Sequence, residues 1–107
     1  MEISACLDTT KYESAYDRAK AALQIAKAAL ESAQAQYYQS KTTIDRYQKL
    51  KTSSQGTLPI QSDWDREWAN YLLAKAQIAN AEAQIAQASH TLRSAQYDLE
   101  RTKIYSP

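Results

Sequence analysis

The sequence predicts an all-α fold, a long two-helix antiparallel coiled-coil hairpin. Large side chains recur every seven residues in both halves of the chain, and this repeat stops between Lys51 and Gln61. The 107 residues include one Gly and two Pro, too little turn material for a sheet of many strands. Ala, Gln, Lys, Glu, Arg and Leu dominate, as in long helices and coiled coils. Two helices of similar length joined by one turn are expected to run antiparallel.

The first helix is expected over residues 10–50. Thr10 and Glu13 have the spacing of a capping box, in which a hydroxyl and a carboxylate satisfy free backbone amides at a helix start. Lys49 and Lys51 add positive charge at the other end, where the helix dipole favours it. Large side chains alternate with mostly small ones at spacings of three and four residues: Tyr16, Ala19, Leu23, Ala26, Leu30, Ala33, Tyr37, Ser40, Ile44 and Tyr47.

A tip turn is expected over residues 51–61 and a second helix over residues 62–102. Ser62 is predicted to cap this helix, with Asp63 and Asp65 in its first turn. The same alternation continues in Trp64, Tyr71, Ala74, Ile78, Ala81, Ile85, Ala88, Leu92, Ala95 and Leu99. Large side chains of one helix can then fill the spaces beside alanines of the other. The seven-residue period predicts a left-handed supercoil.

Several apolar residues lie off this seam: Ile25, Tyr38, Trp68, Leu72 and Tyr97. Together they exceed what a two-helix seam needs, so further chains are expected to pack side by side in the working assembly. A wider seam with scattered exposed residues is the alternative. Trp68 and Leu72 are the candidates for a lateral or tip interface.

Composition argues against several classes of partner. The net charge is +1, from 13 basic and 12 acidic side chains that are well mixed, so nucleic acid and anionic lipid are not expected as main partners. No run of roughly 18 apolar residues is present, so no membrane span is expected in this chain. Ile3-Ser4-Ala5-Cys6 looks like a lipoprotein cleavage site, but no signal-like apolar stretch precedes it and lipidation is not expected.

Neither a catalytic centre nor a cofactor is predicted. His90 is the only histidine and has no cysteine or carboxylate cluster at metal-ligand spacing, so it is expected to be a solvated helix residue. Asp63, Asp65 and Glu67 lack the glycine and the ligand spacing of a calcium loop and are better explained by the helix dipole. No nucleophile with an adjacent base, phosphate loop or catalytic carboxylate pair is recognisable.

The two ends of the chain carry a more specific signal. Residues 3–8 look like the end of a strand, and residues 102–107 look like a helix exit that leads into another strand. The first segment includes Leu7-Asp8 followed by Tyr12, and the second reads Leu99-Glu100-Arg101-Thr102-Lys103-Ile104-Tyr105-Ser106-Pro107. Both motifs resemble the membrane fusion protein family, the HlyD-like periplasmic adaptors of tripartite efflux and secretion pumps. The resemblance implies that residues 1–9 end a first lipoyl half-motif and that residues 103–107 begin the return to the second.

The tip also resembles adaptors that contact a TolC-like outer-membrane channel through an Arg, a Leu four residues later and a Ser after the turn. Arg46 and Leu50 match by type and spacing. The serine does not transfer cleanly, because the segment before Trp64 is about three residues longer than the family pattern. Its equivalent is Thr57 or Ser62.

Other interpretations of the tip residues stay open. Arg46 could be a solvated charge that pairs with Asp45 or Asp63. Leu50 could belong to the seam, and Ser62 could serve only as a helix cap.

By resemblance, the chain is the hairpin of a periplasmic, inner-membrane-associated adaptor that is not an enzyme. It would link an inner-membrane transporter to a TolC-like channel, with several copies, often six, standing side by side. The rival hypothesis is an antiparallel coiled-coil scaffold or dimerisation arm unrelated to export. The exported molecule and the energy source cannot be inferred from these residues.

Overall fold

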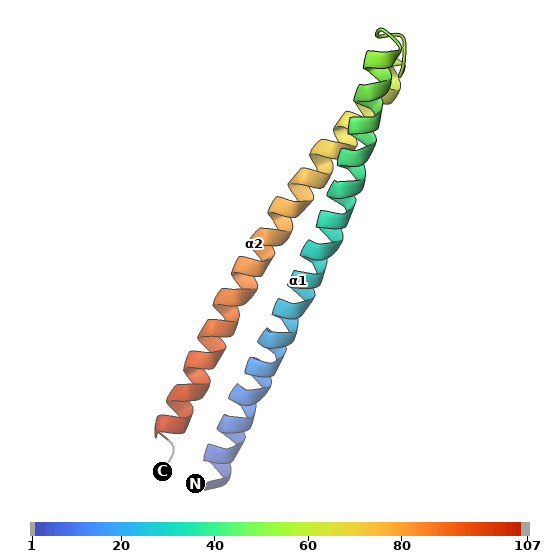
Figure 1. Ribbon diagram of the computed structural model, residues 1–107. Helices are drawn as coiled ribbons and strands as arrows, with labels where there is room; N and C mark the ends of the chain where they lie inside the picture. Colours follow the sequence, from blue (N-terminus) through green and yellow to red (C-terminus); the bar gives the residue numbers. More distant parts are fainter. Residues whose placement is uncertain (1, 106–107) are drawn as a thin grey trace. The chain divides into compact units, whose positions relative to one another are not determined.

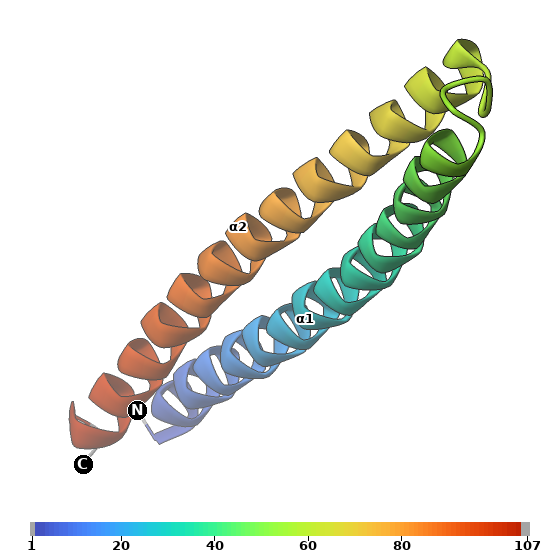
Figure 2. The same cartoon turned by 45° about the horizontal axis from the view of Figure 1, so that its top comes forward.

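The computed structural model describes the backbone of residues 2–105 and the side chains of residues 9–102. The chain forms two helices, α1 (Glu2–Ser53) and α2 (Gln61–Tyr105), and the described residues include no strand. In Figure 1 and Figure 2 the two helices run in opposite directions. The predicted all-α antiparallel hairpin is confirmed.

The chain divides into two compact units. One, called here the base unit, combines Met1–Ala28 with Ala83–Pro107, and the other, the tip unit, is Ala29–Glu82. Each unit therefore contains a segment of α1 and a segment of α2.

In both units the predicted seam is the part shielded from solvent. Every seam position is buried or half-buried. The buried residues are mainly alanines, 5–8% exposed: Ala19 and Ala26 in the base unit, and Ala33, Ala74 and Ala81 in the tip unit, where Ile44 is 5% exposed. Most large seam residues are only half-buried, because each helix has a single neighbouring helix to cover its apolar stripe.

Helix α1 begins earlier than predicted. It starts at Glu2 rather than Thr10, and residues 3–8, expected to end a strand, are helical. No Gly or Pro interrupts residues 2–9, so the helix continues through them and the Thr10–Glu13 pair lies inside it. The predicted capping box is therefore wrong. The side chains of residues 2–8, including Cys6, lie outside the described residues.

The C-terminal end of α1 is a Schellman motif, which extends the helix to Ser53. The Gly56 N–H donates to the Lys51 carbonyl at 2.9 Å, and the Gln55 N–H donates to the Thr52 carbonyl at 3.3 Å. Gln55 and Gly56 have φ values of 58° and 87°, in the left-handed region. Glycine is the usual residue at the first of these two positions, but here it is occupied by Gln55.

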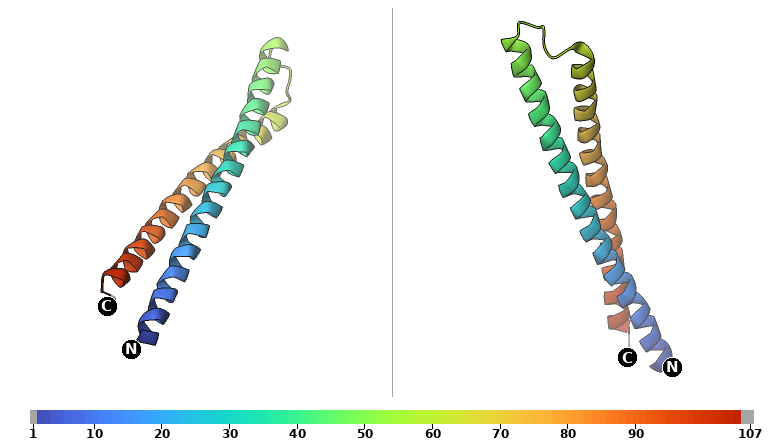
Figure 3. Two further views of the ribbon diagram at one scale, coloured as in Figure 1. Left: turned by 60° about the horizontal axis from the view of Figure 1, so that its bottom comes forward. Right: turned by 90° about the vertical axis from the view of Figure 1, so that its right-hand side faces the viewer.

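The linker between the helices comprises residues 54–60, shorter than the predicted turn over 51–61. Figure 3 shows it joining the ends of α1 and α2 in the tip unit. The Ser54 hydroxyl accepts a hydrogen bond from the Leu58 N–H and donates to the Leu58 carbonyl, both at 2.9 Å. The Thr57 hydroxyl donates to the Ser54 carbonyl, and the Leu58–Pro59 peptide bond is cis. The hydrogen bonds of Ser54 and Thr57 give the linker a defined conformation of its own.

Helix α2 begins at Gln61, and the Ile60 carbonyl accepts its first hydrogen bonds, from the Asp63 N–H at 3.0 Å and the Trp64 N–H at 3.1 Å. Ser62 is the second residue of the helix, so the prediction that it caps α2 is wrong. The predicted negative charge in the first turn is present as Asp63.

The far end of α2 also differs from the prediction. Residues 103–105 were expected to leave the helix, but α2 continues to Tyr105, because no Gly or Pro precedes that residue in the last turns. The expected return strand beyond this point falls on Ser106 and Pro107, outside the described residues. Over the described residues, no helical segment combines the length and the apolar character needed to cross a membrane.

Candidate functional site

Arg46 and Leu50 lie in the last two turns of α1, one turn apart. Leu50 is 39% exposed, whereas the seam residue Ile44 is 5% exposed. Leu50 is therefore not an ordinary seam residue, and much of its side chain is accessible to a partner. Arg46 is exposed as well.

Arg46 does not form the intrachain ion pair considered as an alternative. Asp63 is 3.5 Å from Arg66, measured from Oδ1 to Nη2, and no ion pair within the described residues includes Arg46. Its guanidinium can present several N–H donors in one plane, the geometry that suits a carboxylate on a partner.

Thr57 and Ser62, the two candidates for the family's serine, differ in their hydrogen bonds. Both are exposed. The Thr57 hydroxyl proton is used within the linker, on the Ser54 carbonyl. No hydrogen bond of the described residues uses the Ser62 hydroxyl, so Ser62 is the better placed of the two to donate to a partner.

Two further tip residues were missed by sequence reasoning. Leu58 is 49% exposed and Ile60 is 55% exposed, on either side of Pro59. We call these two residues, together with Arg46 and Leu50, the tip patch: three exposed apolar side chains and one cation in the linker and in the last two turns of α1. The signal in the sequence was a Leu-Pro-Ile run within an otherwise polar segment.

A line of four aromatic rings, the aromatic ladder, lies in the tip unit. Trp64 and Trp68 are stacked with ring centroids 6.2 Å apart, and Trp68 and Tyr71 are stacked at 5.4 Å. Tyr71 of α2 then meets Tyr37 of α1, with ring centroids 5.5 Å apart and an interplanar angle of 31°. The ladder thus follows α2 for two turns and then crosses to α1.

The two tyrosines of the ladder also share a hydrogen bond. Their hydroxyl oxygens are 3.3 Å apart, and either can donate. This bond raises the pKa of Tyr71 above its ordinary value, with smaller contributions from burial and from the charges of Tyr37 and Asp45. The phenol is therefore held in its protonated form.

Lysines lie over two rings of the ladder. Lys51 Nζ is 5.4 Å from the centroid of Trp64, and Lys75 Nζ is 5.8 Å from the centroid of Tyr71. Both distances are within the range of cation–π attraction.

The predicted interface candidates Trp68 and Leu72 are exposed, at 42% and 48%. The other off-seam apolar residues named from the sequence, Ile25, Tyr38 and Tyr97, are exposed too, at 59–72%. Leu73, which the sequence did not single out, is 59% exposed and lines a groove with Gln36, Thr43 and Asn70. An interface role for Trp68 and Leu72 stays a prediction.

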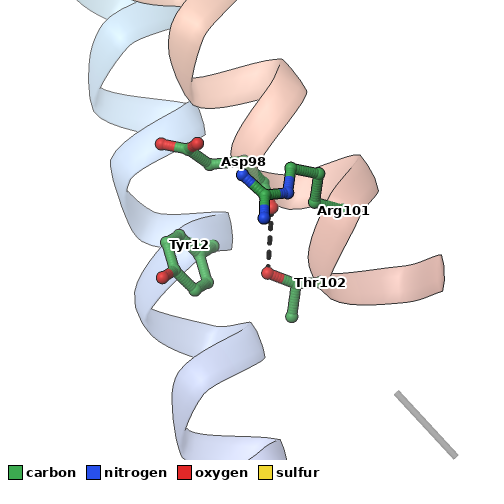
Figure 4. A pocket seen from close by; sticks show the side chains of 4 residues that line it. All are labelled: Tyr12, Asp98, Arg101 and Thr102. Carbon is green, nitrogen blue, oxygen red and sulfur yellow. Dashed lines mark hydrogen bonds between the residues drawn. The ribbon is translucent and has the colours of Figure 1, made fainter. Parts of the chain in front are cut away.

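In the base unit, one groove is lined by Tyr12 of α1 and by Asp98, Arg101 and Thr102 of α2 (Figure 4). Three of these residues, Tyr12, Arg101 and Thr102, belong to the two end motifs that carry the family resemblance. The Thr102 hydroxyl donates to the Asp98 carbonyl at 2.9 Å, as Figure 4 shows. The structure thus brings residues of both motifs to the same groove.

Metal-binding residues do not gather in the part of the chain that the structure describes, where no group of three His, Cys, Asp or Glu side chains could hold an ion. His90 is exposed on α2, as expected for a solvated helix histidine.

Comparison with known proteins gives no relative. No family model matches the chain, no curated protein matches it, and no solved structure matches it. The argument for a function therefore depends on the residues themselves.

Proposed function

We propose that this chain is the α-helical hairpin of a periplasmic adaptor, which links an inner-membrane transporter to a TolC-like outer-membrane channel and docks to the channel through its tip. The hairpin is not catalytic. It belongs to a protein of the inner-membrane-associated type, and neighbouring copies, often six in such adaptors, stand beside it.

The tip patch is the observation that supports this proposal most strongly. Leu50, Leu58 and Ile60 expose 39–55% of their surface around one linker, and Arg46 lies one turn from Leu50. An exposed apolar group beside an unpaired guanidinium is suited to a partner that offers an apolar pocket and a carboxylate. Such a surface at a hairpin end fits docking to another protein better than packing within the hairpin.

The test is capture of a purified TolC-like channel by the adaptor that contains this hairpin. Arg46→Asp reverses the charge of the tip patch, and Leu50→Ala removes an apolar anchor. We expect each substitution to weaken capture and the double variant to abolish it. Binding of the Arg46→Asp variant should depend less on salt concentration than binding of the wild-type adaptor does.

Matched controls come from outside the tip patch, and the charge control comes from the base unit. Arg93→Asp makes the same charge reversal at an exposed position there, and Leu73→Ala, in the tip unit but outside the tip patch, removes a leucine that is 59% exposed. Both should bind the channel as wild type does. Undiminished capture by the double tip variant, or equal losses in tip and control variants, would exclude the tip patch as the docking surface.

The rival function, a self-associating coiled-coil scaffold, is favoured by a different observation. Ile25, Tyr38 and Tyr97 are each more than half exposed and lie off the seam. Sedimentation equilibrium of wild type and of Tyr38→Ser with Ile25→Ser distinguishes the two functions. Stable dimers that dissociate in this variant, together with a failure to capture the channel, would favour the scaffold.

A further inference from the structure

We propose that Tyr37 and Tyr71 form a site of oxidative modification, at which a peroxide-driven one-electron oxidant joins α1 to α2 through a dityrosine bond. The site lies within the tip unit and does not depend on the proposed function.

The distances between the two tyrosines carry the proposal. Their hydroxyl oxygens are 3.3 Å apart and their ring centroids are 5.5 Å apart. The ortho carbons of a tyrosine are bonded to the carbon that bears the hydroxyl, so the two sets of ortho carbons lie next to this hydrogen bond. Coupling between groups already held together is strongly favoured over coupling between separate molecules. Both rings are half-buried, which hinders approach by a tyrosine of another chain.

The chemistry removes two electrons and two protons. Each phenol loses one electron and its hydroxyl proton, which gives two phenoxyl radicals. The radicals share their unpaired electrons in a new bond between ortho carbons, and the hydrogens on those carbons move to the oxygens, which restores both phenols. Hydrogen peroxide accepts the two electrons and two protons and leaves as two molecules of water.

Trp68 provides an accessible point of oxidation for this pair. Trp68 is 42% exposed, and its ring stacks on Tyr71 with a centroid distance of 5.4 Å. An electron removed from Trp68 can be replaced by one from Tyr71, which loses its hydroxyl proton at the same time. The exposed indole thereby transmits oxidation to a tyrosine pair that an enzyme-sized oxidant cannot easily reach.

Tyr38 is the natural comparison. It follows Tyr37 directly but is 72% exposed, and no ring contact in the described part of the chain includes it. Oxidation of Tyr38 should therefore produce coupling between chains, whereas oxidation of Tyr37 should produce coupling within one chain.

The experiment treats the dilute chain with a haem peroxidase and hydrogen peroxide. Monomers are isolated by size, digested with trypsin and analysed by mass spectrometry. We expect a dityrosine-linked pair of peptides, residues 28–41 and 67–75, whose mass is lower by two hydrogens than the sum of the separate peptides. Tyr37→Phe should abolish this species, and Tyr38→Phe, altered in the same peptide, should retain it.

Two outcomes would overturn the proposal: dityrosine found only in covalent dimers, or an unchanged linked peptide in Tyr37→Phe. Circular dichroism of each variant shows whether its helices are intact. The peptides identified by mass spectrometry in the oxidised wild-type chain test the proposal without any substitution. Trp68→Phe keeps an aromatic ring but removes the oxidisable indole, so it should slow formation of the same product. An unchanged rate would refute the part assigned to Trp68. Leu72→Ala is the control for a change in the neighbouring exposed surface and should leave the rate as in wild type.

Discussion

The base unit and the tip unit are stabilised differently although one seam pattern runs through both. Among the residues of the base unit whose side chains are described, the buried ones are Ala19 and Ala26. In the tip unit, three buried alanines are accompanied by Ile44, which is 5% exposed, and by the contact of Tyr37 with Tyr71 across the helices. Alanine buries little apolar surface, so the base unit gains less hydrophobic stabilisation from each buried position than the tip unit does.

This difference shows how one repeat serves two purposes. An alanine-lined seam brings two helices together without specifying any feature of their outer faces. The tip unit adds a buried large residue, Ile44, to the seam and, around the linker, exposes Leu50, Leu58 and Ile60. The proposed docking surface would need a firmly held scaffold, and the additional packing lies in the same unit as the tip patch.

The largest predicted contrast between the units comes from truncating one large seam residue in each. Ile44→Ala should destabilise the chain by about 2–4 kcal/mol, because the residue is buried and the cavity has few ways to close. Leu23→Ala in the base unit should cost about 1–2 kcal/mol, because Leu23 is half-buried and loses less transfer free energy. Urea unfolding followed by circular dichroism measures both. Equal losses would show that the two units are stabilised alike.

A smaller effect, of the opposite sign, is predicted at the end of α1. Gln55 has a φ of 58°, a conformation that is unfavourable for a residue with a side chain. Gln55→Gly should remove this strain. Glycine loses more conformational entropy on folding, and with that cost included the variant should be more stable by about 0.5–1 kcal/mol. Thermal unfolding measures the gain.

The neighbouring Gly56 provides the matched control. Its φ is 87°, and a Cβ there would meet no atom within 4 Å, so Gly56→Ala tests backbone strain without a steric clash. It should destabilise the chain by about 1 kcal/mol. A loss of stability in Gln55→Gly would mean that its side chain has a role in the tip that its φ does not reveal.

The seam could be predicted from the sequence because it depends only on periodicity. Its predicted positions, from Tyr16 to Leu99, are all buried or half-buried. The helix ends could not be predicted in the same way, since they depend on competition between local signals and helix propagation. The Thr10–Glu13 pair has the form of a capping box but is overridden by a helix that starts at Glu2.

The candidate site was predictable in part for a related reason. Exposure of Trp68 and Leu72 follows from their distance from the seam, and it is observed. The Schellman motif at Gln55 was not predictable, because glutamine is rarely found in the left-handed conformation. Nor was the contact between Tyr37 and Tyr71, since seam periodicity identifies which residues face the partner helix but not which pairs meet across it.

The smallest predicted effect concerns pH, and it separates the tip unit's tyrosine pair from an exposed tyrosine. The raised pKa of Tyr71 means that the fold favours the neutral phenol, chiefly through the hydrogen bond with Tyr37. Its contribution to stability is complete below the unfolded-state value of about 10 and is lost as the pH rises through the higher pKa of the folded state. The Tm of the wild-type chain should therefore fall between pH values of about 8 and about 11.

Tyr37→Phe removes the main cause of the raised pKa of Tyr71, so the Tm of this variant should fall less over this interval. Tyr38→Phe changes a tyrosine that is 72% exposed, so the Tm of this variant should fall as much as that of wild type. Since each variant lacks one tyrosine, the difference between the Tm shifts of the two variants isolates the hydrogen-bonded pair. Identical shifts in the three proteins would show that the hydrogen bond between Tyr37 and Tyr71 does not stabilise the tip unit.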